Sequence, residues 1–204
     1  MNGAVADAKS ALQAALKLEP NSLEALHWLA VAENRDGDAV AARAVVDKIL
    51  EQDPHYLPAL SDEMEFAADR KDYRIALLAQ LSRMKALSDP PASEYCRLGA
   101  IWIKISNLGE AEPVLLKGTL KDPYSYACNL ELGELYRETH RLELAREHFE
   151  TVIRLYPDSD VSVYKSLAGL YFSIGDRKAA ESILRRGHRI FPDDSELQKA
   201  SGDL

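Results

Sequence analysis

The chain has 204 residues, of which 47% are hydrophobic and 28% are charged, and its formal net charge is -8 at pH 7. This balance is typical of a folded protein and excludes an intrinsically disordered chain. The acidic net charge disfavours binding to nucleic acid or to an anionic membrane surface, because both require a face rich in cations. No apolar run approaches the roughly 18 residues of a membrane-spanning helix, so we expect no membrane insertion of this segment.

The N-terminal stretch, residues 1–10, lacks the charged start and the apolar run of a secretory signal, and Asp7 interrupts it early. We therefore take the cytoplasm as the default compartment. The two cysteines, Cys96 and Cys128, are too few for a disulfide scaffold and lack the spacing of zinc ligands. We expect them to be buried or groove-lining thiols.

The first predicted element, residues 3–20, has the pattern of the second helix of a helical hairpin. Ala8, Leu12 and Ala15 lie on one face of this helix by their spacing. The first helix of the same hairpin is missing. We therefore expect the chain to begin in the middle of a helical hairpin and to be a piece of a longer protein.

Prolines that terminate helices recur along the rest of the chain with a nearly constant period. Pro20 and Pro54 are 34 residues apart, and Pro123, Pro157 and Pro192 follow one another at intervals of 34 and 35 residues. This period is typical of a repeat built from two short helices. It divides the chain into five full units, residues 21–54, 55–90, 91–123, 124–157 and 158–192, and leaves 193–204 as a short C-terminal or capping helix.

A small residue marks the same place in every unit, where the two antiparallel helices have to approach closely. A bulky apolar residue follows one helical turn later, as Leu12 follows Ala8 and Phe149 follows Ala145. Gln80 breaks this series, so we expect residues 55–90 to pack less well than the other units. The alanines that form this column are Ala8, Ala42, Ala76, Ala111, Ala145 and Ala180.

The unit at 124–157 carries the fullest set of pattern residues. They are Leu132, Gly133, Tyr136, Ala145, Phe149 and Pro157, in the order L-G-x2-Y, A-x3-F and P. With this set the chain resembles the tetratricopeptide repeat family, although Asn129 stands where the pattern has Trp. The resemblance extends from about Ala4 to Pro192. It implies an all-α fold, an α-solenoid in which antiparallel helix-turn-helix units form a right-handed superhelix.

Each unit is predicted to read helix, tight turn, helix. Gly37 and Gly175 suit a left-handed conformation in two of these turns. Lys71, Ser106 and His140 fall at the equivalent position of the other three, where they must adopt that conformation or the turn must differ.

The resemblance also implies a concave groove lined by the first helices of successive units. Such a groove binds a peptide or a helix of a partner protein, and its centre here is apolar with mixed charges beside it. The lysine and asparagine pairs that hold the C-terminal tail of a chaperone are absent, so we do not expect that ligand. The groove residues implied by the family register are His27, Asn34, Arg35, Glu65, Cys96, Ala100, Ile103, Lys104, Leu130, Glu134, Arg137, Lys165 and Phe172.

Signals for catalysis are missing from the sequence. There is no glycine-rich phosphate loop, and His140 and His148 lie eight residues apart without the spacing of a metal-ligand pair. We therefore expect no enzyme, no catalytic residue, no cofactor and no metal site. Aromatic residues recur at helical spacing and are predicted to pack in the core rather than to stack on bases. They are Tyr95, Trp102, Tyr136, Tyr164 and Tyr171.

One charged residue falls at a position that is apolar in the other units. Glu63 stands where Leu132 stands in the fullest unit, and a charge there is costly unless it is paired. We expect Arg83, also at an inter-helix position, to approach it.

The sequence predicts a non-catalytic scaffold for protein–protein interaction. Two further functions remain open: a regulatory or substrate-recruiting region of a larger enzyme or membrane-associated protein, and self-association through uncapped ends of the array. A groove face that binds nothing specific is equally compatible with the residues. The identity of the partner cannot be read from the sequence.

Overall fold

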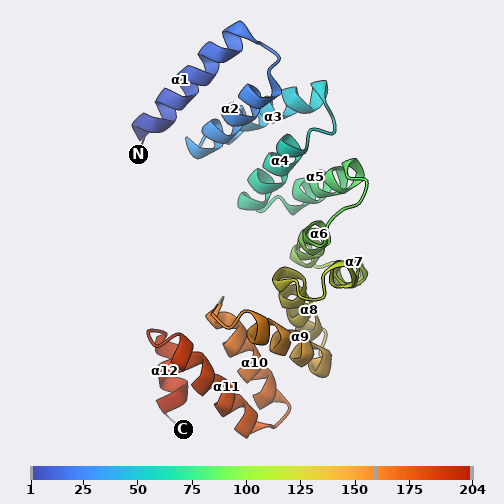
Figure 1. Cartoon of the computed structure of the whole chain (residues 1–204), viewed down its shortest axis with the longest axis vertical. Helices are drawn as coiled ribbons and strands as arrows, with labels where there is room; N and C mark the ends of the chain where they lie inside the picture. Colours follow the sequence, from blue (N-terminus) through green and yellow to red (C-terminus); the bar gives the residue numbers. More distant parts are fainter. Residues whose placement is uncertain (1, 159, 203–204) are drawn as a thin grey trace. The chain divides into compact units, whose positions relative to one another are not determined.

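The structure is a computed structural model, and it describes residues 2–158 and 160–202. These residues form twelve α-helices and no strand. The chain divides into two compact units, Met1–Pro90 and Pro91–Leu204, each with its own internal contacts. Each unit is a stack of helical hairpins (Figure 1), as the all-α solenoid prediction requires.

The Met1–Pro90 unit contains two antiparallel hairpins and one further helix at its N-terminal edge. α2 packs against α3, α4 packs against α5, and α1 packs against α2. The helices are α1 (Asn2–Leu18), α2 (Leu23–Arg35), α3 (Ala39–Gln52), α4 (Leu57–Asp69) and α5 (Tyr73–Ala86).

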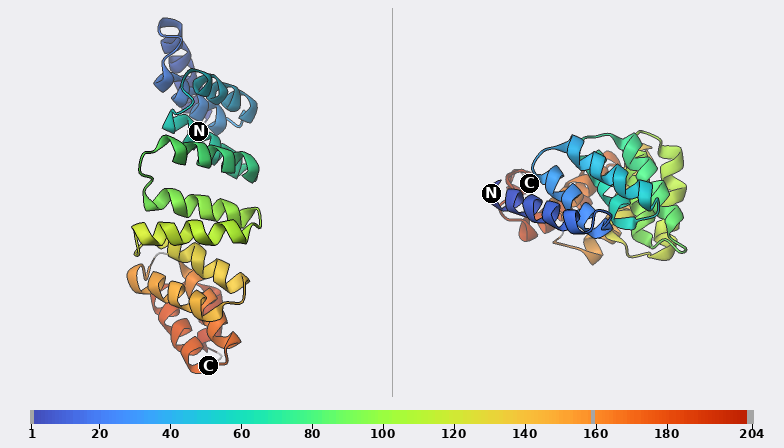
Figure 2. Two further views of the ribbon diagram at one scale, coloured as in Figure 1. Left: turned by 90° about the vertical axis from the view of Figure 1, so that its right-hand side faces the viewer. Right: turned by 90° about the horizontal axis from the view of Figure 1, so that it is seen from above.

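The Pro91–Leu204 unit contains three hairpins and a short final helix. Figure 2 shows α6 and α7 lying side by side, and α12 packs against α11. The helices are α6 (Ala92–Lys104), α7 (Leu108–Lys121), α8 (Tyr126–Glu138), α9 (Leu142–Leu155), α10 (Val161–Ser173), α11 (Arg177–Ile190) and α12 (Ser195–Gly202).

Polar side chains fix where most of these helices begin. At α8, for example, the hydroxyl of Ser125 accepts a hydrogen bond from the N–H of Cys128, which satisfies one of the free donors of the first turn. Side chains play the same role at further helices, through Ser22, Asp38, Asp72, Asn107, Asp160 and Asp176.

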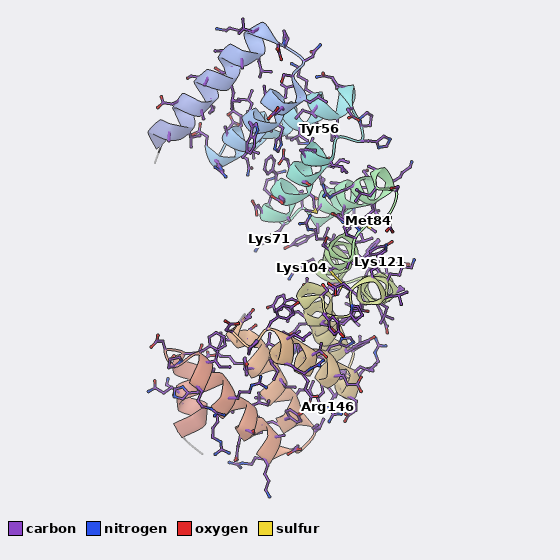
Figure 3. All side chains as sticks on the ribbon, in the orientation of Figure 1. Tyr56, Lys71, Met84, Lys104, Lys121 and Arg146 are labelled. Carbon is purple, nitrogen blue, oxygen red and sulfur yellow. A yellow bond between two sulfur atoms is a disulfide. The ribbon has the colours of Figure 1, made fainter. Side chains whose placement is uncertain are left out.

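All five hairpin turns contain a residue in the left-handed conformation. Gly37 and Gly175 have φ values of 89° and 84°, and Lys71, Ser106 and His140 have values of 60°, 61° and 57°. The three non-glycine residues therefore adopt the backbone that the repeat requires rather than a different turn. Lys71, labelled in Figure 3, lies between α4 and α5. Such a conformation costs roughly 1–2 kcal/mol for a residue with a Cβ atom, so the packing of the helices must enforce it.

The helix crossings are as close as the small residues predict. Ala42, Ala111 and Ala145 are fully buried. At Gly133, an added Cβ atom would lie 2.6 Å from the ring of Phe149, so only glycine lets α8 approach α9 this closely. Tyr136 and Tyr164 are buried in the same core, which confirms their predicted packing role.

Candidate functional site

The predicted groove residues of the Pro91–Leu204 unit lie on one face of α6, α8 and α10. Ala100, Ile103, Leu130, Glu134 and Lys165 are half-buried, whereas Lys104, Arg137 and Phe172 are exposed. Ile103 and Leu130 pack at the margin of the core, and 46% of Phe172 is exposed. We call this surface the α6/α8/α10 face. Lys104, at the C-terminal end of α6, is labelled in Figure 3.

A pocket of about 580 Å³ opens on this face between α8 and α10. An added Cβ atom at Gly169 would meet no atom within 4 Å, so this part of the pocket is open. The pocket contains three basic side chains beside an apolar wall, an arrangement that suits a carboxylate. The lining residues are Arg137, His140, Leu142, Lys165, Ser166, Gly169, Leu170 and Ser173.

Hydrogen bonds hold the polar groups of the pocket in place. The guanidinium of Arg137 donates two hydrogen bonds to Glu134, of 2.6 and 2.8 Å, and the hydroxyl of Ser166 donates one of 3.0 Å to the same carboxylate. Glu134 therefore accepts hydrogen bonds from side chains of both α8 and α10. The family register predicted Glu134, Arg137 and Lys165 as groove residues. It missed His140, which lies in a turn, and Ser166, which lies on α10 at a position that the register does not assign to the groove.

Lys165 is held by carboxylates from the region of α12. Its ammonium donates to Glu196 at 2.5 Å and to Asp194 at 3.0 Å, and these bonds raise the pKa of Lys165, the bond to Glu196 more than the bond to Asp194. The pKa of Asp194 is lowered, chiefly because the carboxylate accepts a hydrogen bond from the N–H of Leu197 and also because it faces Lys165. Lys165 therefore binds carboxylates of the chain itself, which is the type of group that a ligand in this pocket would present to it.

Cys96 does not line the groove as a thiol, contrary to the sequence-based expectation. It is buried and forms a disulfide with Cys128, which joins α6 to α8. Gly118 makes room for the bond, since an added Cβ atom there would lie 2.3 Å from the Cys128 sulfur. The 32-residue separation of the cysteines is close to one repeat and was the available signal.

The predicted groove residues of the Met1–Pro90 unit lie on α2 and α4. His27 is half-buried, and its Nδ1 lies 2.5 Å from a carboxylate oxygen of Asp62. Burial raises the pKa of Asp62, although the hydrogen bond with His27 opposes this shift. Asn34 is half-buried, whereas Arg35 and Glu65 are exposed. His27 is therefore engaged within the chain.

The expected approach of Glu63 to Arg83 is replaced by other contacts. The carboxylate of Glu63 lies 3.7 Å from the guanidinium of Arg43. Arg83 donates hydrogen bonds to the carbonyl of Leu57 and to the hydroxyl of Ser61. Burial raises the pKa of Glu63, and the charge of Arg43 only partly opposes that shift. The expectation was wrong because Arg43 reaches the carboxylate from α3.

The described residues hold no cluster of three or more histidine, cysteine or acidic side chains that could bind a metal ion. None of the described helices combines the length and the hydrophobicity that crossing a membrane would need. The stacked hairpins and the α6/α8/α10 face on their first helices define the class of the protein as a repeat protein built from helical hairpins.

Comparison with known proteins identifies the family. Family models described as tetratricopeptide repeat match residues 1–63 and 125–193, which together make up well over half of the chain. The chain belongs to the tetratricopeptide repeat family. Repeats of this family serve in general as scaffolds for protein–protein interaction.

Curated relatives are distant and much longer. Protein CTR9 homolog from Arabidopsis thaliana is 21% identical over 99% of this chain and 19% of that protein. Neutrophil cytosol factor 2 from Homo sapiens is 27% identical over 57% of this chain and 21% of that protein. The chain thus spans about a fifth of the length of these relatives.

Solved structures share the fold at low sequence identity. PilW, a widely conserved type IV pilus biogenesis factor, has a TM-score of 0.78 at 17% identity, over 96% of this chain and 90% of that one. YrrB, a tetratricopeptide repeat protein with an unusual peptide-binding site, has a TM-score of 0.72 at 18% identity, over 95% and 98%. At these identities the likeness shows the fold alone.

Proposed function

We propose that the α6/α8/α10 face binds a segment of a partner protein that presents an apolar side chain next to a carboxylate. The observation that carries this proposal is the open pocket between α8 and α10, where Arg137, His140 and Lys165 converge beside Leu142 and an apolar wall. The face acts by binding, without a catalytic step.

The two halves of the ligand follow from the chemistry of the face. Ile103 and Leu130 are half-buried on it and offer apolar contact to an anchoring side chain. Arg137 and His140 lie on the pocket side, where a charge-assisted hydrogen bond to a carboxylate would form. Because Arg137 already shares Glu134 with Ser166, the partner carboxylate would compete with an internal one.

Gly169 offers a direct test, because the open space beside it accepts a side chain without a clash. Peptides selected from a random display library on the immobilised chain should be enriched in acidic residues next to an apolar one. We expect Gly169→Glu to weaken their binding by about tenfold, since it places a carboxylate in a pocket that takes one. Gly169→Ala should bind like the unchanged chain and serves as the matched control.

The apolar half of the face has its own test. Ile103→Glu together with Leu130→Glu should abolish binding of the same peptides and should remove partners captured from the lysate of the native organism. Selected peptides without acidic enrichment, or partners that survive both changes, would show that the face is wrongly assigned. Circular dichroism of each variant separates lost binding from lost folding.

A further inference from the structure

Lys165 lines the pocket between α8 and α10, but its charged group is held on the side of α12. Its ammonium bonds to Asp194 at 3.0 Å and to Glu196 at 2.5 Å, and neither of these carboxylates lines the pocket. The next residue along the chain, Ser166, donates to Glu134 on α8. Adjacent residues of α10 therefore reach opposite neighbours, since α10 lies between α8 and α12 (Figure 1).

The permanent charges at the pocket are already paired within the chain. Arg137 forms an ion pair with Glu134, and Lys165 forms ion pairs with two carboxylates. Two permanent cations are thus matched with three carboxylates. A partner carboxylate gains the charge of Lys165 only by taking the place of an internal one.

Glu196 is the internal carboxylate that can leave at the least cost. Asp194 also accepts a hydrogen bond of 2.9 Å from the N–H of Leu197 at the start of α12, and its side chain is only 21% exposed. Glu134 accepts hydrogen bonds from both α8 and α10. The side chain of Glu196, by contrast, is 76% exposed, and among the described side chains only Lys165 binds it. An exposed ion pair of this kind adds little stability.

The side chain of Lys165 has room to move its charge into the pocket. Gly169 lies one helical turn further along the same face of α10. An added Cβ atom at Gly169 would meet no atom within 4 Å, so the space beside the lysine is open. Because a lysine carries its ammonium on a flexible stem, rotation of this stem can bring the charge into the pocket while α10 stays in place.

We propose that Glu196 is an internal competitor for Lys165, which the carboxylate of a bound partner segment displaces. In the free chain Glu196 and Asp194 hold the ammonium on the side of α12. In the complex the ammonium turns into the pocket and binds the partner carboxylate, while Asp194 keeps its hydrogen bond to Leu197. Glu196 thereby lowers the affinity of the α6/α8/α10 face for acidic segments. This inference rests on the proposed function of that face.

The test compares Glu196→Gln with the unchanged chain, and its probe is a fluorescein-labelled acidic peptide from the display selection. In fluorescence anisotropy at low salt, the peptide should bind Glu196→Gln about two- to fivefold more tightly, as expected when an exposed competing ion pair is lost. Asp193→Asn is the matched control, because it removes an exposed charge near Glu196 that forms no ion pair with Lys165. It should change the affinity by less than about twofold.

Three further measurements show whether the gain acts through Lys165. In a Lys165→Met background, Glu196→Gln should no longer raise the affinity, because the cation for which the two carboxylates compete is absent. The same peptide with its acidic side chains changed to amides should bind Glu196→Gln and the unchanged chain alike. The amide of Leu197 should stay protected from hydrogen exchange when the peptide binds, since Asp194 still caps α12.

The outcomes separate this inference from the proposed function. If no acidic peptide binds, or if Gly169→Glu does not weaken binding, the proposed function fails and the inference fails with it. If acidic peptides bind as proposed but Glu196→Gln binds them no more tightly, or gains as much in the Lys165→Met background, only the inference is overturned. Loss of Leu197 protection on binding also overturns it, because α12 as a whole would then move rather than one side chain.

Discussion

The α8–α9 hairpin and the α4–α5 hairpin have the same backbone but different side chains where their two helices cross. In α8–α9 the crossing joins Gly133 to the ring of Phe149, which is fully buried. At the equivalent places of α4–α5 stand Met64 and Gln80, both of them buried. A left-handed turn closes each hairpin, at His140 in one case and at Lys71 in the other. The repeat backbone therefore forms even where a polar side chain lies at the helix crossing. The apolar contact at the other crossing adds to the stability of the hairpin.

Ionisable groups show the same contrast between the two units. Glu112 accepts hydrogen bonds from Arg141 at 2.7 and 2.8 Å and from the hydroxyl of Tyr136, and the Arg141 contact is the main reason that its pKa is lowered. Glu63 lies 3.7 Å from Arg43, and burial raises its pKa. One carboxylate stabilises its unit when ionised, and the other destabilises its unit.

The largest expected effect is at the apolar crossing. Phe149→Ala should lower the free energy of unfolding of the Pro91–Leu204 unit by about 3–5 kcal/mol, because it removes a fully buried ring and leaves a cavity. Gln80→Ala should cost the Met1–Pro90 unit markedly less, since fewer apolar contacts are lost. Native-state hydrogen exchange, read separately for each unit, measures both changes. Equal costs would mean that the two crossings do not differ in packing energy.

Loss of the disulfide between Cys96 and Cys128 should come next. Cys96→Ser with Cys128→Ser, or reduction with dithiothreitol, should destabilise the Pro91–Leu204 unit by about 2–4 kcal/mol, because the bond closes a loop of about one repeat. The Met1–Pro90 unit contains no cysteine and serves as the internal control. Mass spectrometry after alkylation of the native chain checks the bond itself, and two alkylated cysteines without reductant would contradict it.

A pair of glycines on first helices should separate close packing from helix propensity. Gly133→Ala should destabilise the Pro91–Leu204 unit by about 1–3 kcal/mol, because the new methyl group meets the Phe149 ring. Gly169→Ala should stabilise the same unit by about 0.5–1 kcal/mol, because the open site gains only the propensity of alanine. Thermal unfolding followed by circular dichroism gives both values. The same sign for both glycines would refute the assignment of Gly133 to a tight crossing.

The repeat architecture could be predicted because its signals are local and recur. Alanines such as Ala111 and Ala145 mark crossings, and the recurring prolines set the period. The turn residue His140 was placed correctly by period alone, although it is not a glycine. Each of these signals needs only spacing along the chain, which is why one unit predicts the next.

The contacts between repeats could not be predicted in the same way. Cys96 and Cys128 meet where Gly118 leaves room for the Cys128 sulfur atom, and that fit exists only in three dimensions. Glu63 finds Arg43 rather than Arg83 because the choice depends on how far each side chain reaches across a helix crossing. The pocket beside Gly169 likewise depends on side chains that lie a full repeat apart, such as Arg137 and Ser173. The repeat register identifies the helix face on which a residue lies, but it does not identify the residues that it contacts there.

The smallest expected effects test the contrast between the two carboxylates. Because the pKa of Glu63 in the folded state is raised above its value in the unfolded chain, the folded state binds more protons, and stability falls as the pH rises through that window. Glu63→Gln should therefore stabilise the Met1–Pro90 unit at pH 7, by on the order of 1 kcal/mol, and have no effect below about pH 4.

The lowered pKa of Glu112 reverses the sign: Glu112→Gln should destabilise the Pro91–Leu204 unit at pH 7, and the loss should fade as the pH falls below the ordinary glutamate pKa. Urea unfolding of both variants between pH 3 and about pH 8 measures the two profiles, and a common sign at neutral pH would show that the two units hold their carboxylates alike.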